Sequence, residues 1–539
     1  MNKIFNRIAN SNWAPVLVIC FFGLIIFRGG IFFDFLNWDD DYNILLNTNV
    51  LNFDLSIIWL NPYYGMYIPV TYTLWSVLAQ LTSNPSPAIF HGLNVILHMI
   101  NGVQVYYLAK LVIEKFSVQL ASTVKWMPVI AALIFISHPL QVEPVMWISA
   151  SRDLLSVLFA LLAIQFYVRS PSITNTVVAT AMFMIGILCK PGIIVVPIIL
   201  FLNDMFLLKC SLRKTSLRLA PMLIISLFAV LIANSIQSDQ IEKRLPVVSV
   251  GSKLLVTLDS LGFYVSKTLV PVNLSADYAR TPASIPNQPD IFVHIALVAV
   301  FAFAAVILWR RADTIFRIGL IFFMTALAPM LGLVPFFYQT VSTVADRYAY
   351  LPLVGFGIMV SSFCITNTRI VLMAFITLAL AVFSTARTSV WKNDRIFFSE
   401  ILIAQPQSAS GHLGLGNYYM SKKDFELAAA SFENAIRFDI LNSAAYANLL
   451  LCLNLQGLHA KVILLANNAF DQERFKIINE GTEGLAAMYS NLGFAYLKNG
   501  NAQKSFKFYC IASKHNPNSK DVISGLEKTR ILVPNGVCE

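Results

Sequence analysis

The sequence predicts an all-α protein in two parts, a polytopic helical membrane domain followed by a C-terminal α-solenoid of tetratricopeptide (TPR) type. Of the 539 residues, 57% are hydrophobic and only 13% are charged, whereas a soluble globular chain is about half apolar and a quarter charged. The mean hydropathy is +0.66. The apolar residues form long runs as far as residue 390, and the rest of the chain has the composition of a soluble domain.

Eleven apolar stretches are long enough to cross about 30 Å of hydrocarbon. They lie at residues 13–33, 90–113, 127–146, 153–169, 175–190, 191–208, 219–235, 291–309, 315–338, 347–365 and 369–387. A twelfth stretch, 254–270, contains Asp259 and Lys267 and is expected to lie in the interface or to re-enter. The first stretch follows Lys3 and Arg7 and resembles a retained signal anchor, because no small-residue cleavage site follows it.

The basic residues between these stretches predict the orientation. With eleven spans every basic loop lies on one side of the membrane, and residues 34–89 contain no Lys or Arg. Basic loops face the cytoplasm, so we expect a cytoplasmic N-terminus and an extracytoplasmic C-terminus. The loop 34–89, the segments 138–153 and 236–290 and the repeats then share the extracytoplasmic face, which is the periplasm in a bacterium or the ER lumen in a eukaryote.

The net charge of +10 is explained by these orienting loops. Nucleic acid is not an expected partner, because no basic run is interleaved with aromatic residues. The seven cysteines are dispersed without a C-x-x-C pair. They are therefore predicted to be buried small residues rather than a disulfide framework or a zinc site.

The C-terminal part carries a helix-pair repeat pattern. Residues 409–442 match a tetratricopeptide unit, a later unit matches again, and 443–480 is a degenerate copy with a short insertion. Residues 520–530 are predicted to form the polar closing helix of the array. The expected domains are thus 1–390 with the large first loop 34–89, a linker at 391–408, and repeats at 409–530. Such arrays bind extended peptide or protein, and the alternative is a spacer or a self-association surface.

Asp39 and Asp40 follow the first span at the start of the loop without basic residues. Adjacent carboxylates at a membrane surface suit a general base, since a like charge and partial desolvation raise a carboxylate pKa. They also suit a divalent cation, the one cofactor that the sequence leaves open. The third interpretation is a helix cap followed by a solvated acidic turn.

Charged side chains recur at other predicted outer turns. Between spans three and four lie His138, Glu143, Arg152 and Asp153, and Arg152 is a natural bidentate partner for phosphate. Asp153 could instead cap the next helix or neutralise Arg152. Lys190 offers a second cation or snorkels to the interface, and Asp346 before Arg347 is also a simple helix cap. Together they indicate a site for an anionic lipid-linked donor, because a coupled transporter would place its ionisable groups near the midplane.

These motifs resemble a known family, the transmembrane and TPR repeat-containing O-mannosyltransferases and their bacterial relatives within the GT-C superfamily. The resemblance rests on Asp39, Asp40, Ile44, Asn47, His91, Asn94, His98, the run from His138 to Asp153, Cys189, Lys190, the run from Leu274 to Tyr278, and the run from Ala345 to Pro352. It covers nearly the whole chain. The chain departs from the family in its shorter repeat array and in Pro191 and Gly192, which replace the usual acidic residue after Lys190.

The resemblance implies an inverting transfer of a sugar from a polyprenyl-phosphate donor to a Ser or Thr hydroxyl of an extracytoplasmic protein, with membrane lipid around the enzyme. The implied base is Asp39 or Asp40. The implied donor-side residues are His138, Glu143, Arg152, Lys190 and Arg347, and the supporting residues are His91, Asp153, Asp277 and Asp346. Two alternatives from other classes are a membrane-anchored TPR assembly factor, for which the aspartates would be dispensable, and a lipid-linked sugar flippase.

Overall fold

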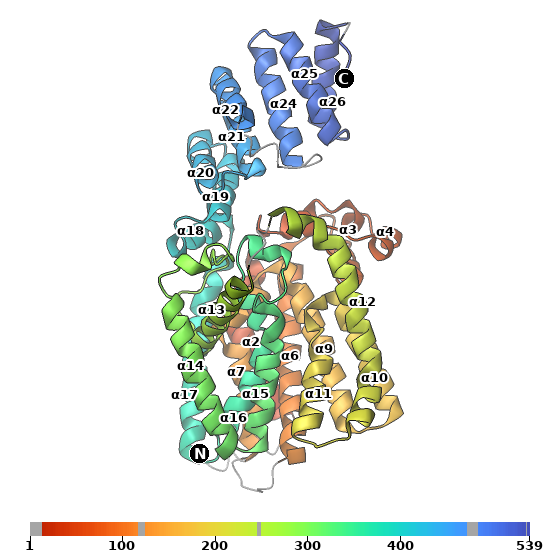
Figure 1. The fold of residues 1–539 in the computed structure, drawn as a ribbon, viewed down its shortest axis with the longest axis vertical. Helices are drawn as coiled ribbons and strands as arrows, with labels where there is room; N and C mark the ends of the chain where they lie inside the picture. The colour runs from red at the N-terminus through yellow and green to blue at the C-terminus, as the bar shows by residue number, and fades with distance from the viewer. Residues whose placement is uncertain (1–12, 117–123, 245–248, 472–482, 535, 539) are drawn as a thin grey trace. The chain divides into compact units, whose positions relative to one another are not determined.

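The computed structural model describes residues 13–116, 124–244, 249–471, 483–534 and 536–538. Within these ranges the regular secondary structure is helical, and the single strand-like pairing is an isolated bridge between Tyr63 and Met66. The prediction of an all-helical fold is therefore confirmed for the described part. The chain divides into two compact units, Met1–Asn393 and Asp394–Glu539 (Figure 1).

Among the described residues, six segments of the first unit are long and apolar enough to cross a membrane. They are Ala14–Phe32 with helix α2 (Ala14–Phe27), α6 (Pro87–Phe116), Ile148–Arg169 with α9 (Ser151–Arg169), residues Leu212–Gln237 of α12 (Leu212–Arg244), α14 (Ile291–Arg311), and Asn367–Trp391 with α17 (Asn367–Thr388). A bent pair makes a seventh if it is one span, joining α7 (Met127–Ser137) to Pro139–Met146, which contains α8 (Val142–Met146).

Four shorter apolar segments lie where the remaining four spans are predicted. They are α10 (Ile173–Cys189), Pro191–Phe206 with α11 (Val196–Phe206), Thr314–Met330 with α15 (Thr314–Leu327), and α16 (Pro352–Ser361). The count of eleven spans stays a prediction. Helix α13 (Val250–Leu269) covers the stretch expected in the interface, and it is not among the six long candidates of the described chain. Lys3 and Arg7 lie outside the described residues.

The bend of 55° between α7 and the segment after it follows from the prolines. His138 has extended backbone angles immediately before Pro139, as expected for a residue that precedes proline. Pro139 and Pro144 each lack the N–H that a continuous helix needs. The chain therefore turns at the end of α7, and residues 138–151 are folded across the ends of neighbouring helices.

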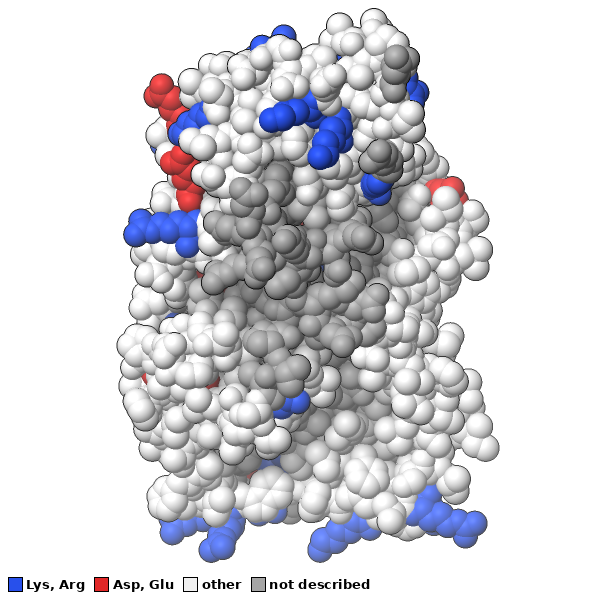
Figure 2. All heavy atoms as spheres, turned by 45° about the horizontal axis from the view of Figure 1, so that its top comes forward, with Lys and Arg blue, Asp and Glu red and all other residues white. Residues whose placement is uncertain are grey.

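Helices α12, α14 and α17 bury few of the residues in their apolar windows, while the window of α9 is two-thirds buried. An apolar exterior of this kind suits a lipid environment. Figure 2 shows lysine and arginine side chains gathered along the lower edge of the view. Inside the unit, Gly319 of α15 lets α16 approach closely, since a Cβ at this position would lie 2.4 Å from the backbone of Met359. Small residues commonly allow such contacts between membrane helices.

The first large loop is folded onto one end of these helices. It contains α3 (Thr48–Leu51), α4 (Leu55–Leu60) and α5 (Pro69–Ala79), which share a hydrophobic core with Phe90 and Ile148. Trp75 of α5 donates a hydrogen bond of 2.6 Å to Ser151, and Thr71 donates one of 2.9 Å to the carbonyl of Cys189. The loop is thereby tied to the start of α9 and the end of α10.

The second unit is a series of helices in which each packs against the next described one. They are α18 (Asp394–Ala404), α19 (Ala409–Ser421), α20 (Phe425–Phe438), α21 (Ser443–Leu455), α22 (His459–Asp471), α24 (Glu483–Lys498), α25 (Ala502–His515) and α26 (Lys520–Leu532). The segment 391–408, predicted as a linker, thus contains helix α18, whose Phe398 packs against Gly414. Residues 472–480 of the predicted degenerate repeat lie outside the described ranges, and the assignment as a TPR solenoid stays a prediction.

The prediction for the cysteines is wrong for one pair. Cys510 of α25 and Cys538 form a disulfide with a Cα–Cα distance of 5.3 Å, and Cys210 is exposed rather than buried. The two bonded residues are 28 positions apart. They become neighbours only because the chain turns back after α26, which residue spacing does not reveal.

Candidate functional site

The candidate site lies where several helices of the first unit begin or end. Helices α2, α7 and α10 end at this side of the bundle, and α6, α9 and α11 begin there, so residues 28–86, 138–151 and 190–195 come together. The other ends carry the basic residues Lys115, Arg169, Lys209, Arg213, Arg311 and Arg369. The carboxylates and cations singled out in the sequence can thus be compared within one region.

Asp40 is buried and fully hydrogen-bonded. Its Oδ1 accepts bonds from the backbone N–H and the hydroxyl of Ser149, at 2.9 and 2.6 Å, and its Oδ2 accepts one of 3.1 Å from the N–H of Leu36. Burial raises the pKa of Asp40 to about 7, although these hydrogen bonds favour the ionised form. This carboxylate joins the start of the first loop to the turn before α9.

Asp39 has a different environment. Its side chain is 27% exposed, and its Oδ2 lies 3.6 Å from Nη2 of Arg152. Burial raises the pKa of Asp39 above its usual range, against the opposing charges of Arg152, Arg347 and Lys190. A carboxylate with a raised pKa that solvent can still reach is a suitable proton acceptor.

Arg152 and Lys190 place two cations close to Asp39. The guanidinium of Arg152 is almost fully buried, and its Nη1 donates to the sulfur of Met66 at 3.3 Å. Its Nε is buried without a hydrogen-bond partner. Lys190 donates to Oδ1 of Asp153 at 2.6 Å, while Oδ2 of Asp153 is buried and unpartnered. Buried polar groups without partners are uncommon, so this part of the site has unused hydrogen-bonding capacity.

Trp147 connects this group to a second ion pair. The guanidinium groups of Arg152 and Arg347 lie 5.2 and 5.1 Å from the centre of its ring. Arg347 forms a buried ion pair with Glu143, and the backbone N–H of Arg347 donates a hydrogen bond of 3.1 Å to the same carboxylate. Tyr338 and Tyr348 also face this guanidinium, at 4.2 and 4.9 Å. Glu143 and Arg347 therefore satisfy each other and form a rigid support under Trp147.

Asp346 and Asp277 belong to a neighbouring polar group. Asp346 accepts a hydrogen bond of 2.6 Å from Tyr278, and Asp277 accepts one of 2.7 Å from the N–H of Ala279. Burial, helped by the charge of Glu143, raises the pKa of Asp346 to about 7. The first contact fixes the loop between α13 and α14 on the turn before α16, and the second lies within that loop.

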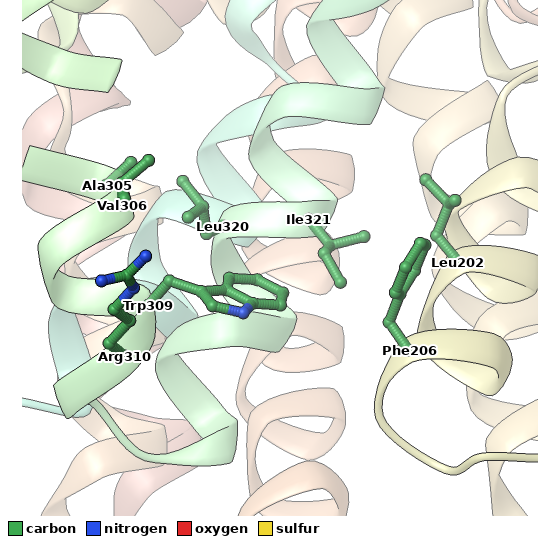
Figure 3. Close-up of a pocket in the computed structure, with 8 residues that line it drawn as sticks. All are labelled: Leu202, Phe206, Ala305, Val306, Trp309, Arg310, Leu320 and Ile321. Carbon is green, nitrogen blue, oxygen red and sulfur yellow. The ribbon is translucent and has the colours of Figure 1, made fainter. Parts of the chain in front are cut away.

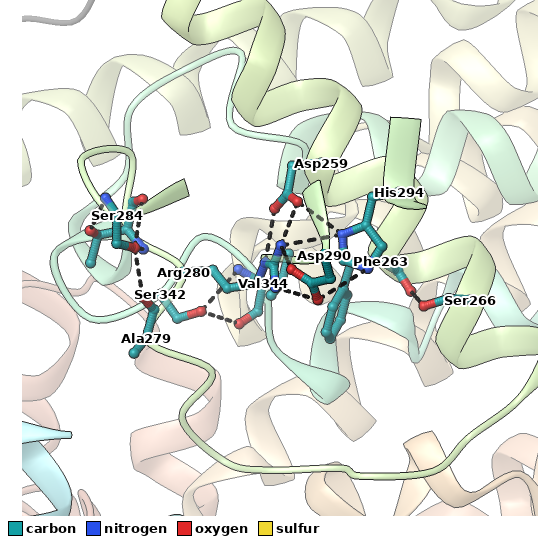
Figure 4. Close-up of polar contacts among 11 residues, drawn as sticks. Asp259, Phe263, Ser266, Ala279, Arg280, Ser284, Asp290, His294, Ser342 and Val344 are labelled. Carbon is teal, nitrogen blue, oxygen red and sulfur yellow. Dashed lines mark hydrogen bonds and ion pairs between the residues drawn. The ribbon is translucent and has the colours of Figure 1, made fainter. Parts of the chain in front are cut away.

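The same loop is held by a buried charge network that the sequence analysis did not find (Figure 4). Arg280 binds both oxygens of Asp259, at 2.5 and 2.9 Å, and both oxygens of Asp290, at 2.9 and 3.0 Å. His294 of α14 contacts Asp259 at 2.9 Å. The aspartate that made 254–270 look unlike a membrane span thus holds the loop that carries Tyr278. Bidentate arginine pairs of this kind define geometry well.

Two predicted residues are not brought into the group. His138 is buried with both ring nitrogens engaged by backbone, one with the carbonyl of Thr268 at 3.0 Å and one with the N–H of Leu140 at 3.2 Å. His91 lies against Phe33, with one ring nitrogen 3.4 Å from the carbonyl of Asp34. Both histidines shape the turns around the site.

A separate apolar cavity of about 440 Å³ lies between α11, α14 and α15 (Figure 3). Its lining consists of Leu202, Phe206, Ala305, Val306, Trp309, Arg310, Leu320 and Ile321. None of these residues belongs to the charged group described above. This cavity is therefore not a candidate for the chemistry of the carboxylates.

The geometry also tests the idea of a divalent cation between Asp39 and Asp40. Both oxygens of Asp40 accept N–H or O–H groups, and Asp39 faces a guanidinium. Within the described residues no three His, Cys, Asp or Glu side chains converge as metal ligands would. The two carboxylates do not fit a shared metal ion, which needs several free oxygen ligands.

The fold and the site define an all-helical membrane protein with a buried group of carboxylates and cations at one end of its helices. The chain is similar to proteins named protein O-mannosyl-transferase. It is 24% identical to F38B6.6 of Caenorhabditis elegans, over 69% of this chain and 54% of that protein. It is 24% identical to TMTC3 of Mus musculus, over 82% and 53%, and to TMTC3 of Homo sapiens, over 76% and 50%.

The resemblance drawn from the motifs is thus confirmed by curated relatives of that name. The chain spans about half the length of these relatives. No family model matches it.

The sequence analysis missed several side chains that build the site. Ser149 and Trp147 lie inside the motif 138–153, but neither is titratable and neither received a role. Met66, Tyr278 and Tyr338 come from distant segments and reach the group only through folding. Tyr338 is the last residue of the predicted apolar stretch 315–338, so nothing in the sequence set it apart.

Proposed function

We propose that the chain is a membrane glycosyltransferase that moves a sugar from a polyprenyl-phosphate donor to Ser or Thr hydroxyls of extracytoplasmic proteins, as an inverting enzyme of GT-C type. The observation that carries the proposal is the pairing of Asp39, partly exposed and with a raised pKa, with Arg152, whose buried Nε has no hydrogen-bond partner. A base and a cation with unused hydrogen-bonding capacity lie side by side. The similarity to proteins named protein O-mannosyl-transferase supports mannose as the sugar.

The proposed step needs no further reactant. The acceptor hydroxyl oxygen bonds to the anomeric carbon while the bond from that carbon to the phosphate oxygen breaks. The hydroxyl proton passes to Asp39, and the polyprenyl phosphate leaves with the bonding electron pair. Arg152 stabilises the charge that develops on the leaving phosphate, which is the usual way a fixed cation accelerates such a transfer.

The two aspartates have separate roles in this proposal. Asp39 is the base, because its side chain is 27% exposed and its Oδ2 lies 3.6 Å from Nη2 of Arg152. Asp40 is a positioning residue, because its oxygens are occupied by Ser149 and Leu36. The pair Glu143 and Arg347 supports Trp147 from below, and Lys190 with Asp153 completes the donor side.

The proposed topology places the site and the repeat unit outside the cytoplasm. The basic residues at the opposite helix ends support this orientation. The disulfide between Cys510 and Cys538 supports it independently, because disulfides persist in oxidising compartments. The repeat unit is proposed to hold the acceptor protein, with the polyprenyl donor arriving from the bilayer.

The test uses the purified full-length chain with a synthetic polyprenyl-phosphate mannose and a threonine-containing peptide. The expected product is the peptide with one added hexose, detected by mass, and an anomeric configuration opposite to that of the donor. Transfer should occur without added divalent cation and in the presence of a chelator. No hexose addition by an intact, donor-binding preparation would contradict the proposal, and retention of configuration would contradict the single-step mechanism.

A further inference from the structure

A stacked pair of tyrosines lies beside Asp39 and has no part in the mechanism above. The rings of Tyr42 and Tyr64 are 5.1 Å apart with an interplanar angle of 9°. Their side chains are 43% and 51% exposed. Tyr42 follows Asp39 by three residues, and the phenol of Tyr64 is close enough to interact electrostatically with Asp39 and Asp41.

The backbone that presents Tyr64 is a tight turn with an unusual residue in it. Tyr63 and Met66 exchange two backbone hydrogen bonds, of 2.8 and 2.9 Å, and both intervening residues have positive φ, 47° for Tyr64 and 72° for Gly65. Turns with positive φ at both central residues strongly prefer Asn, Asp or Gly. A bulky residue with positive φ is an outlier that surrounding structure must enforce. A tyrosine is thus kept at a position where it carries a conformational cost.

The turn contacts the site through both of its end residues, Tyr63 and Met66. The hydroxyl of Tyr63 donates a hydrogen bond of 3.0 Å to the carbonyl of Tyr42. The turn therefore holds the ring of Tyr64 against the ring of Tyr42. The sulfur of Met66 accepts the contact from Arg152. The same four-residue turn therefore touches the proposed phosphate-binding cation and presents an exposed aromatic surface.

We propose that Tyr42 and Tyr64 form the subsite that binds the acceptor polypeptide next to the hydroxyl to be modified, which rests on the proposed function. Arg152, the cation nearest to Asp39, is buried, whereas the two tyrosines are exposed, which favours the tyrosines as the contact for a polypeptide that arrives from solvent. Tyrosine rings give large, rigid contact area with little entropy loss, and they suit proline and aliphatic side chains. The loop 34–89 contains no Lys or Arg, which suits a neutral or basic polypeptide.

The first experiment measures binding without turnover. The full-length protein in lipid nanodiscs is titrated with a short peptide that has one threonine flanked by proline and valine. Tyr64→Asn removes the ring but tolerates the left-handed backbone, and Tyr64→Phe keeps the ring. Leu60→Asn, at a 79% exposed position of the same loop, is the matched control. We expect Tyr64→Asn to weaken peptide binding by about three- to tenfold, the worth of an aromatic contact, while Tyr64→Phe and Leu60→Asn bind normally.

A second measurement separates binding from folding. Asparagine adopts the positive φ of this position more easily than tyrosine, so the thermal midpoint of Tyr64→Asn should equal or exceed that of the unchanged protein. If Tyr64 had a purely structural role, the thermal midpoint would fall. Normal peptide affinity in Tyr64→Asn, or no peptide binding by the unchanged protein, would overturn the subsite. A rise in the apparent Kd for polyprenyl-phosphate mannose of the same size would assign the pair to the donor instead. Intact binding without any hexose transfer would count against the proposed function alone.

Discussion

The most discriminating perturbation changes the two adjacent aspartates one at a time. Asp39→Asn removes the proposed base. Loss of a general base costs about 10²–10⁴-fold in rate, which corresponds to roughly 3–5 kcal/mol of activation free energy. The folded state should be nearly unaffected, because Asp39 is partly exposed and its ion pair with Arg152 spans 3.6 Å.

Asp40→Asn should show the opposite pattern. The amide oxygen of asparagine can still accept from the N–H and hydroxyl of Ser149, but its NH₂ group would face the N–H of Leu36. One hydrogen bond is lost and two donors oppose each other in a buried position, which costs about 1–3 kcal/mol. We expect a lower thermal midpoint. Turnover should fall only to the extent that the substitution shifts the neighbouring residues of the site.

The assay pairs turnover, at saturating donor and acceptor, with thermal unfolding of the same preparations. Asp54→Asn is the matched control, because Asp54 caps α4 in the same loop with a single carboxylate oxygen. Turnover of Asp39→Asn within tenfold of the unchanged enzyme would refute the assignment of the base. A larger loss of turnover for Asp40→Asn than for Asp39→Asn, at an unchanged thermal midpoint, would show that the roles of the two residues are reversed.

Four further predictions follow from other contacts. Arg152→Gln should raise the KM for the polyprenyl-phosphate donor equally for every acceptor, and an unchanged donor KM would exclude Arg152 from phosphate binding. Cys510→Ser should lower the free energy of unfolding of the second unit by about 3–4 kcal/mol, the value for a loop of this length, as measured by denaturant titration. Because the folded-state pKa values of Asp40 and Asp346 are raised to about 7, their contribution to stability is present below the unfolded pKa near 4 and is lost as pH rises through 7. The thermal midpoint of the first unit should therefore fall between about pH 4 and about pH 7, and a midpoint that rises over this range would contradict these shifts. The exposed Cys210 should react with an impermeant thiol reagent only from the cytoplasmic side, and labelling of sealed cells from outside would invert the topology.

The fold class and the general place of the site were predictable because they depend on local properties of the chain. The length of an apolar run and the basic residues beside it can be recognised within about twenty residues of sequence. They indicate where a membrane helix lies and at which of its ends polar residues gather. Asp39, Arg152 and Lys190 were singled out in this way. The structure places them close together.

The partners of each charged group were not predictable, because they are set by tertiary contacts. Asp39 and Asp40 look equivalent in sequence, and they are distinguished by tertiary partners, Ser149 for Asp40 and Arg152 for Asp39. Glu143 and Arg347 are 204 residues apart, and residue spacing does not reveal that they form an ion pair. His138 has the residue type of a catalytic group, but the carbonyl of Thr268 in α13 and the N–H of Leu140 engage its two ring nitrogens.

The bond between Cys510 and Cys538 has a consequence for how the protein matures. It closes the segment that includes α26 onto α25, and a thiol pair of this kind oxidises only after the chain has entered an oxidising compartment. In the proposed topology the last helices are then completed in a different chemical environment from the one in which the chain is synthesised. Under that topology, chains with two free thiols at these positions are molecules whose C-terminal unit has not yet reached an oxidising compartment, and the redox state of this pair reports delivery.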